Sequence, residues 1–330
     1  MKILVTGGSG FIGSELVRHL ITNTEHEVFN IDKLTYAANQ KSLENISENK
    51  RYAFKQLDIC DFQGVQEVFN NFKPDAIMHL AAESHVDKSI TGSDEFIESN
   101  IIGTYNLLKC SRNYVDSISG SDKFRFLHVS TDEVYGSLNT GDEKFKEESV
   151  YQPNSPYSAS KAASDHLVRA WGHTFNLPVI TTHCSNNYGP WQNEEKLIPL
   201  MISNALNELP LPVYGDGQNI RDWIYVTDHV VGLVTSLIDG KPGEVYNFGG
   251  ENEIKNIDIV NTICDILDNK RAKSNGSSYK ELITFVKDRP GHDFRYAVDN
   301  SKVNEELNWF PKESFTTGIE KTIDWYLRES

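Results

Sequence analysis

Two acidic residues stand next to each other at the end of an apolar run, directly after a hydroxyl residue. Residues 124–129, FRFLHV, have the pattern of a buried strand, and Thr131, Asp132 and Glu133 follow after one serine. Two carboxyl groups in contact, in different surroundings, have their pKa values pushed apart, so one can donate a proton near neutral pH while the other accepts one. The stretch predicts either a solvated turn or an acid–base pair.

A second reactive pair lies on the helical pattern that follows. In SPYSASKAASDHLVRAW, Tyr157 and Lys161 are four residues apart and share one helix face. A nearby ammonium favours the phenolate and lowers the pKa of a tyrosine from its usual value of about 10. The phenolate could take a proton from a substrate hydroxyl, oriented by Thr131, while hydride leaves the same carbon. Because this spacing is common by chance, the chemical interpretation depends on the surrounding elements.

The N-terminal residues predict a dinucleotide site. A short apolar strand turns through Gly7, Gly10 and Gly13 into a helix, and such glycines let the backbone approach a pyrophosphate at the helix N-terminus. The next strand, EVFNID, ends in Asp32, which could bind the ribose hydroxyls and repel a 2′-phosphate. NAD is therefore favoured over NADP, although Lys33 could offset part of that repulsion. A strand–helix–strand unit without nucleotide is the weaker alternative.

Strands continue to alternate with helices through the first half of the chain. YAFKQLDICD predicts a strand that ends at Asp58 and Ile59, near the adenine, and PDAIMHLAAES predicts one that ends at residues 80–82, where small side chains admit a cofactor. This alternation predicts a Rossmann-type α/β fold with a doubly wound parallel sheet. Ligands bind outside the carboxyl ends of such strands, so the Asp132–Glu133 pair lies at the ligand edge and an acid–base role is favoured.

Two domains are expected. Residues 1–185 predict the NAD-binding domain, and residues 222–250 are expected to rejoin its sheet through GEVYNFGG. Residues 186–221 and 251–330 predict a smaller mixed α/β domain that binds the substrate, because Pro- and Gly-rich turns loosen the alternation there.

Composition excludes several partners. A net charge of −15 argues against nucleic acid and anionic membranes. A strand pattern follows the initial Met-Lys at once, with neither a signal peptide nor an apolar run of membrane-spanning length, so we expect a cytoplasmic protein. The four cysteines lack metal-ligand spacing, and no metal site is expected.

Several stretches together resemble a known family. TGGSGFIGS and YSASKAASDHLV resemble the extended short-chain dehydrogenase/reductases as a group, whereas KLTYAAN, HLAAESHVDKSI, STDEVYG, NNYGPWQNEEKLIP, VYGDGQNIRDWIYVTDH and RPGHDFRYAVD resemble the dTDP-glucose 4,6-dehydratase family. The resemblance covers nearly the whole chain. One departure is Ala38, where the family usually has glycine, near the adenosine end.

The resemblance implies a three-step reaction on a nucleotide-linked glucose. NAD, tightly bound and regenerated at each turnover, oxidises carbon 4 with Tyr157 as the base. Glu133 then removes the acidified hydrogen of carbon 5, and Asp132 protonates the departing hydroxyl of carbon 6. Hydride returns to carbon 6, which gives a 4-keto-6-deoxy sugar.

The resemblance also implies the ligand contacts. For NAD these are Gly7, Gly10, Phe11, Ile12, Gly13, Asp32, Lys33, Thr35, Asp58, Ile59, Leu80, Ala81, Ala82, Ser84, Tyr157 and Lys161. For the nucleotide sugar they are Ser84, His85, Thr131, Asn187, Lys196, Leu197, Pro212, Tyr214, Arg221, Asn256, Arg289 and His292. Independently of the family, the two arginines could each clamp a phosphate with paired hydrogen bonds.

Other functions stay open on the sequence alone. A 4-epimerase would use the same tyrosine and lysine but gives no reason for the paired acids. A GDP-mannose dehydratase, a UDP-glucuronate decarboxylase and a non-catalytic NAD-sensing scaffold are further alternatives, and the residues do not choose between thymidine and uridine. Relatives pair as homodimers through helices equivalent to those containing residues 100–114 and 157–175, and the resemblance implies the same here.

Overall fold

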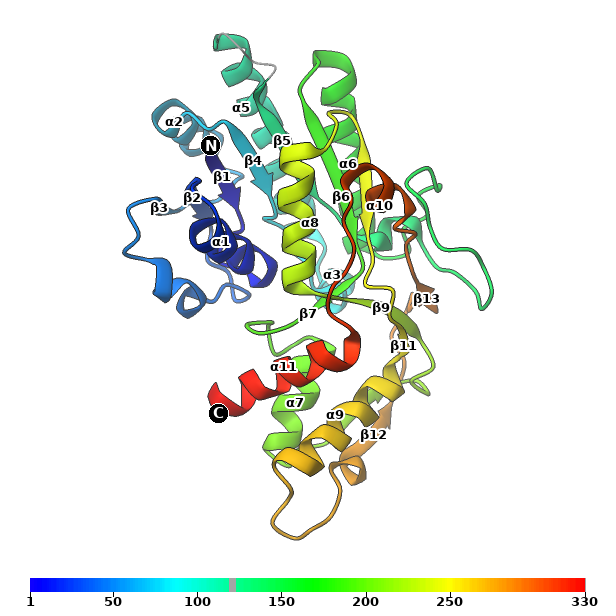
Figure 1. Ribbon diagram of the computed structural model, residues 1–330. Coiled ribbons are helices and arrows are strands. Elements are labelled where there is room, and N and C mark those ends of the chain that lie inside the picture. Colours follow the sequence, from blue (N-terminus) through cyan, green and yellow to red (C-terminus); the bar gives the residue numbers. More distant parts are fainter. Residues whose placement is uncertain (119–122, 330) are drawn as a thin grey trace.

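A seven-stranded parallel sheet forms the larger of two lobes (Figure 1). The computed structural model describes residues 1–118 and 123–329. The strand order is β10-β6-β5-β4-β1-β2-β3, and every neighbouring pair is parallel. The strands are β1 (Lys2–Thr6), β2 (Glu27–Asp32), β3 (Tyr52–Gln56), β4 (Ala76–His79), β5 (Arg125–Val129), β6 (Val179–Cys184) and β10 (Val245–Phe248).

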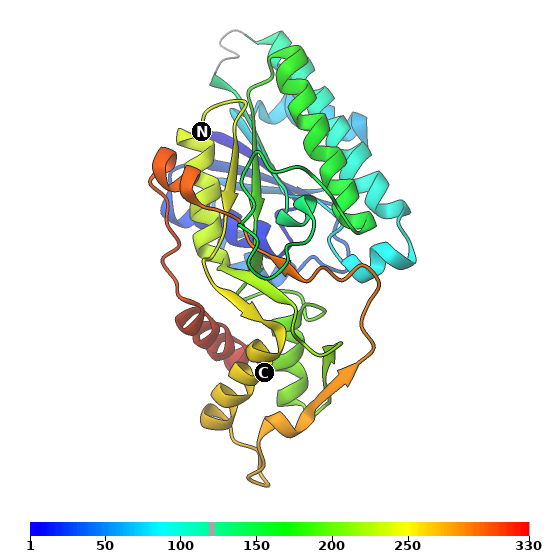
Figure 2. The ribbon, with the colours of Figure 1, turned by 90° about the vertical axis from the view of Figure 1, so that its right-hand side faces the viewer.

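Helices cover both faces of this sheet because successive strand side chains point to opposite sides. Ile3 and Val5 pack in one buried cluster with α1 (Phe11–Asn23), α8 (Val226–Asp239) and α10 (Ser301–Leu307). Leu4, between them, packs in the cluster of the other face. That face carries α2 (Phe62–Phe72), α5 (Thr104–Ser117) and α6 (Pro156–Phe175). Figure 2 shows α5 and α6 (teal and green) side by side at the outer surface.

A series of helical segments connects β4 to β5. The short helix α3 (Val86–Thr91) comes first, and α4 (Asp94–Phe96) then continues through the π-helix η2 (Ile97–Gly103) into α5. The wider turn brings Asn100 against the end of β4, where its amide exchanges hydrogen bonds with the Glu83 backbone and donates to Ser160 of α6. Short π-helical segments are frequent at functional sites, and this one holds the segment that follows β4 in place beside the cavity described below.

The smaller lobe packs two short sheets against three helices. Its strands are β7 (Asn186–Tyr188), β9 (Ile220–Tyr225), β11 (Glu253–Lys255) and β13 (Arg295–Tyr296) in one sheet, with β8 (Leu211–Tyr214) and β12 (Ile283–Val286) in the other. The helices α7 (Leu197–Leu206), α9 (Asn256–Lys270) and α11 (Phe315–Glu329) bury one face each in a common apolar core. Short 3-10 turns are η1 (Gln40–Ile46), η4 (Asp132–Tyr135) and η5 (Tyr279–Leu282).

The chain crosses between the lobes more than once. Within residues 222–250, α8 and β10 lie with the large sheet, whereas residues 222–225 belong to β9 of the smaller one. Asp222 lies at this crossing, where its carboxylate accepts hydrogen bonds from Ser185 (2.6 Å) and the backbone amides of Gly250 (2.9 Å) and Asn252 (2.7 Å). Helix α10, which the sequence analysis assigned to the smaller domain, likewise packs on the large sheet. We propose a two-domain division in which β9 belongs to the smaller domain and α10 to the larger one.

Neither a membrane helix nor a metal cluster occurs in the described part of the chain. No helix there is long and apolar enough to cross a bilayer. No group of three or more His, Cys, Asp or Glu side chains within residues 1–118 and 123–329 is arranged to hold a metal ion.

The glycine turn after β1 generates the first prediction. A Cβ at Gly13 would lie 2.0 Å from the Gly7 carbonyl oxygen and 2.8 Å from Gly8 Cα, so Gly13→Ala must displace backbone. We expect it to lower the free energy of unfolding by about 1–3 kcal/mol, despite the better helix propensity of alanine. Gly92→Ala is the control, because nothing lies within 4 Å of its added Cβ. Chemical denaturation measures both; equal stabilities would contradict the close packing of the turn.

Candidate active site

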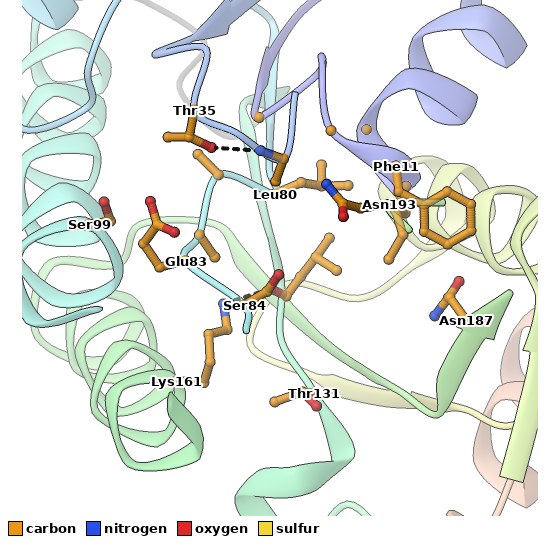
Figure 3. A pocket seen from close by; sticks show the side chains of 18 of the residues that line it. Phe11, Thr35, Leu80, Glu83, Ser84, Ser99, Thr131, Lys161, Asn187 and Asn193 are labelled. Atoms are coloured by element: carbon orange, nitrogen blue, oxygen red, sulfur yellow. Dashed lines mark hydrogen bonds between the residues drawn. The ribbon is translucent and has the colours of Figure 1, made fainter. Parts of the chain in front are cut away.

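A cavity of about 300 Å³ opens at the carboxyl ends of the large sheet (Figure 3). Its walls come from the turn after β1, the ends of β2, β4 and β5, helix α6 and the loop that follows β7. The five predicted catalytic residues all line it: Thr131, Asp132, Glu133, Tyr157 and Lys161. So do all the predicted cofactor residues except Asp58, which borders a neighbouring cavity of about 580 Å³ together with Lys33 and Thr35.

One end of the cavity is shaped for a dinucleotide. Gly7 has φ +73°, and a Cβ there would lie 2.6 Å from the Ala81 amide nitrogen, so the turn and the end of β4 meet backbone to backbone. Helix α1 begins at Phe11 without a side-chain cap, which leaves amide hydrogens free for an anion. The Asp32 carboxylate accepts from the amides of Ser9 (2.9 Å) and Leu34 (2.8 Å) and lies at the cavity wall. These residues fit a dinucleotide.

Lys33 is engaged by a neighbour that the sequence analysis did not single out. Its ammonium lies 2.9 Å from the buried Glu83 carboxylate and donates to the Ser99 hydroxyl at 2.7 Å. Figure 3 shows Glu83 and Ser99 close together on one wall. Glu83 therefore compensates part of the charge that Lys33 could otherwise direct at a 2′-phosphate beside Asp32.

The paired acids occupy different electrostatic surroundings. Asp132 is 2% exposed, and one carboxyl oxygen has no hydrogen-bond partner in the described structure. Burial and the neighbouring Glu133 raise the pKa of Asp132 well above its usual value, which favours its protonated form. Burial also raises the pKa of Glu133, but Arg289, Lys196 and Arg221 oppose that rise and favour its ionised form.

Helix α6 presents the tyrosine and the lysine to the same cavity. Ser155 caps its N-terminus by accepting from the Ser158 amide, and Pro156 follows at the first position, where a missing amide hydrogen costs nothing. Lys161 donates to the Val129 carbonyl at 2.9 Å. The structure corrects one expectation here: burial and then Glu133 raise the pKa of Tyr157 well above its usual value, although Lys161 is on the same face. Burial therefore has a larger effect on the pKa of Tyr157 than the Lys161 ammonium has.

The predicted substrate residues divide between two places. Ser84, Thr131, Asn187 and Lys196 line the cavity, and Lys196 donates to the Ser84 carbonyl at 3.0 Å. The others lie outside its lining, on adjoining elements: His85 before α3, Leu197 on α7, Pro212 and Tyr214 on β8, Arg221 on β9, Asn256 on α9, and Arg289 and His292 between β12 and β13.

Contacts nevertheless draw several of these outer residues together. Asp87 of α3 accepts hydrogen bonds from both Tyr214 (3.3 Å) and Arg289 (3.1 Å). Arg289 Nε and Asn256 Oδ1 are buried polar atoms without a partner in the described structure. Buried polar groups are normally satisfied, so the Arg289 Nε hydrogen is suited to an acceptor such as a phosphate oxygen, and Asn256 Oδ1 to a donor.

Comparisons with known proteins agree with this geometry. A family model described as GDP-mannose 4,6 dehydratase matches residues 4–322. The dTDP-glucose 4,6-dehydratase of Shigella flexneri is 58% identical over 337 residues, which is 99% of this chain and 93% of that protein. The chain belongs to the dTDP-glucose 4,6-dehydratase family.

Solved structures of the family share the whole fold. The enzyme DesIV of Streptomyces venezuelae, solved with NAD and dTDP bound, has a TM-score of 0.91 at 42% identity and covers 99% of this chain and 97% of its own. The enzyme of Bacillus anthracis str. Ames, in complex with NAD, gives 0.87 at 40% identity with the same coverage. The Rossmann-like α/β class predicted from the sequence is confirmed.

Sequence reasoning missed charged residues that line the cavity. Glu83 follows the predicted strand end at residues 80–82 directly, so the rule that ligands bind at strand ends could have found it. The Glu195 carboxylate lies 3.4 Å from His85 Nε2 and 3.1 Å from Lys88 Nζ. These partners are more than a hundred residues away in the sequence, so no local pattern predicts the contacts.

Proposed function

We propose that the protein is a lyase that converts dTDP-glucose to dTDP-4-keto-6-deoxyglucose and water, with NAD oxidised and reduced within each turnover. The observation that carries the proposal is the buried Asp132–Glu133 pair, whose members have different surroundings, beside Tyr157 and Lys161. An epimerase would need only the tyrosine, the lysine and Thr131. The paired acids provide what an elimination requires.

The dinucleotide end of the cavity is assigned to NAD. Two solved relatives contain it, and the Gly7 turn, the uncapped start of α1 and Asp32 fit its pyrophosphate and ribose. When bound, NAD accepts hydride from carbon 4 and later returns it to carbon 6. The Lys33–Glu83 pair and Asp32 together favour NAD over its 2′-phosphate.

Tyr157 takes the first proton in this proposal. The high pKa of the buried phenol means that positive charge must be near it before it can act as a base. The Lys161 ammonium lies on the next turn of α6 and can supply such charge, and a hydrogen bond with the Thr131 hydroxyl opposes the rise in the pKa of the phenol. Removal of the carbon 4 hydroxyl proton then accompanies loss of hydride from the same carbon.

The two acids divide the elimination between them. A ketone at carbon 4 acidifies the hydrogen of carbon 5, and Glu133 removes it because Arg289, Lys196 and Arg221 favour its carboxylate form. Asp132, whose raised pKa favours the protonated form, gives a proton to the departing carbon 6 hydroxyl. The electrostatics thus support independently the assignment that the family resemblance implies.

The nucleotide diphosphate is assigned to the smaller lobe. Lys196, Arg289 and Arg221 bring three positive charges toward Glu133, and the unpartnered Arg289 Nε can donate to a phosphate oxygen. Thymidine as the base rests on the relatives rather than on a contact in this chain.

We also propose a cytoplasmic homodimer. Apolar side chains are exposed along the outer helices, with Ile97 46%, Ile102 47% and Tyr105 38% exposed, and the Tyr105 ring packs on Trp171 of α6. Helices containing residues 100–114 and 157–175 would form the interface. The four free cysteines, three of them buried, suit a reducing compartment.

A product assay tests the reaction. With dTDP-glucose the protein should release dTDP-4-keto-6-deoxyglucose over many turnovers without added NAD, because the hydride is lent and returned at one site. Mass spectrometry follows the loss of water, and UDP-glucose and GDP-mannose test the choice of nucleotide. Release of a dTDP-hexose of unchanged mass would indicate an epimerase, and NADH accumulating in step with product would exclude the internal cycle.

Substitutions should separate oxidation from elimination. Tyr157→Phe should slow hydride transfer on the order of a hundredfold or more. Glu133→Gln and Asp132→Asn keep that base and nearly the same side-chain volume, so both should form enzyme-bound NADH and the 4-keto-glucose stage with elimination blocked. Single-turnover absorbance at the NADH band measures this.

Deuterium exchange then distinguishes the two acids. Glu133→Gln should suppress exchange of the carbon 5 hydrogen with solvent, while Asp132→Asn should retain more of it because only the leaving-group acid is lost. Rapid exchange in Glu133→Gln would remove Glu133 as the base.

The proposed interface predicts a change in oligomeric state. Ile102→Asp places a charge in the exposed apolar strip and should convert a dimer to monomers in analytical ultracentrifugation. Ile238→Asp is the control, since Ile238 is 53% exposed on α8, outside the proposed interface. A wild-type monomer, or a dimer unaffected by Ile102→Asp, would contradict this interface.

A further inference from the structure

Four side chains, three of them buried and one partly buried, converge on one carboxylate beneath the cavity. Asp165 lies on α6, one turn beyond Lys161 and two beyond Tyr157, and is 4% exposed. One of its oxygens contacts His128 Nε2 at 3.0 Å. The other accepts from the Ser130 hydroxyl at 2.9 Å and contacts the Tyr151 hydroxyl at 3.1 Å and His183 Nε2 at 3.0 Å. We call Asp165 and its partners the Asp165 cluster, which consists of His128, Ser130, Tyr135, Tyr151, Asp165 and His183.

The cluster reaches both sets of catalytic residues. Ser130 directly precedes Thr131 at the end of β5. His183, on β6, contacts the Tyr135 hydroxyl at 2.9 Å, and Tyr135 is the last residue of η4, the turn that contains Asp132 and Glu133. The same hydroxyl donates to Asn247 of β10 at 3.1 Å. One buried polar cluster therefore joins α6 to the strand end and to the turn that carries the paired acids.

A buried carboxylate is costly unless it is hydrogen-bonded and its charge is balanced. Although burial alone would raise the pKa of Asp165, hydrogen bonds from His128 and His183 hold it well below its usual value. The proposed reaction uses none of these groups directly. Their position, in contact with each catalytic element but outside the reacting centre, indicates a supporting role.

Asp165 also supplies negative charge to Lys161. Burial lowers the pKa of Lys161, and Asp165 is the first group that opposes this change. The other titratable groups that face these two residues are His79 on β4, His128 on β5, Tyr135 on η4, Tyr151 before α6, and His183 and Cys184 on β6.

Those neighbours do not replace the carboxylate. Burial raises the pKa of the Tyr135 and Tyr151 phenols and of the Cys184 thiol, so they are neutral at pH 7. Burial followed by the Lys161 charge lowers the pKa of His128 to about 4, and His79 is lowered as well, so neither adds positive charge.

We propose that Asp165 is a positioning residue of the reaction, which holds Lys161 and Tyr157 in place against the strand end and the turn that carries the paired acids. The inference rests on the proposed function, since it assigns the residue to the oxidation step of that reaction and to the position of the turn that carries out the elimination. It is a separate claim, because the dehydratase could operate without this particular support.

Asp165→Asn tests it in the full-length protein with its cofactor bound. The substitution keeps the shape and one acceptor oxygen but removes the charge and turns an amide toward Ser130, Tyr151 and His183. We expect a folded protein with a nearly unchanged KM for dTDP-glucose and a single-turnover rate of NADH formation reduced roughly 10–100-fold.

The pH profile distinguishes positioning from mere structural support. Without the Asp165 charge Lys161 releases its proton more easily, so the alkaline limb of the hydride-transfer rate should move to lower pH. Asp116→Asn is the matched control: it removes one acid from the neighbouring helix α5, where that side chain is exposed and pairs with Arg112, and should change neither rate nor limb.

Tyr135→Phe tests the other arm of the cluster. It removes one hydroxyl at η4 and leaves the Asp165 charge, so the alkaline limb should stay in place while elimination slows and enzyme-bound NADH persists longer. If Asp165→Asn does not fold, this variant decides alone, and wild-type elimination in it overturns the proposal.

The outcomes separate this claim from the function it rests on. A folded Asp165→Asn protein with the wild-type hydride-transfer rate and alkaline limb overturns the positioning role and leaves the dehydratase intact. If the wild-type protein itself releases no dehydrated product, the proposed function fails instead.

Discussion

The parallel direction of the large sheet is the constraint on which the rest of the structure depends. All seven strands end at the same edge, so residues separated by more than a hundred positions meet there without long loops. Gly7, Asp32, Ala81 and Thr131 each follow or end a different strand, and each lines one cavity. The smaller lobe needs only to close over that edge, which its β7 loop does with Asn187 and Lys196.

Burial then sets the chemistry that this edge can perform. In water the carboxyl groups of Asp132 and Glu133 would titrate nearly alike. At this edge, one carboxyl oxygen of Asp132 has no partner in the described structure, while Glu133 faces three cations from the smaller lobe. The positive charges of the small lobe oppose the rise in the pKa of Glu133, while burial and Glu133 raise the pKa of Asp132 well above its usual value. The same burial raises the pKa of Tyr157 and so opposes its action as a base, and the Lys161 ammonium lies one turn away on the same helix.

Much of this arrangement could be predicted from the sequence because its signals are local. The glycine spacing at residues 7–13, the acid at the end of EVFNID and the Tyr157–Lys161 spacing each depend on one strand, turn or helix, and all of them line the cavity. The pairing of Lys33 with Glu83 and the convergence on Asp165 depend on which strands are neighbours, and strand order is a property of the tertiary fold. The direction of the Tyr157 pKa was missed for a related reason, since spacing predicts the ammonium but not the depth of burial.

The buried hydrogen bonds at Asp165 lie between the elements whose relative position the reaction depends on. A reaction that removes hydride, eliminates water and returns hydride needs the oxidising helix and the eliminating turn in one fixed relation through all three steps. An apolar interface between α6 and β5 would tolerate small slips, because hydrophobic contact is not directional. Hydrogen bonds that meet at Asp165 are directional, and in a dry interior an unmatched partner is costly. The fold therefore places its directional contacts where relative position matters most for the chemistry above them.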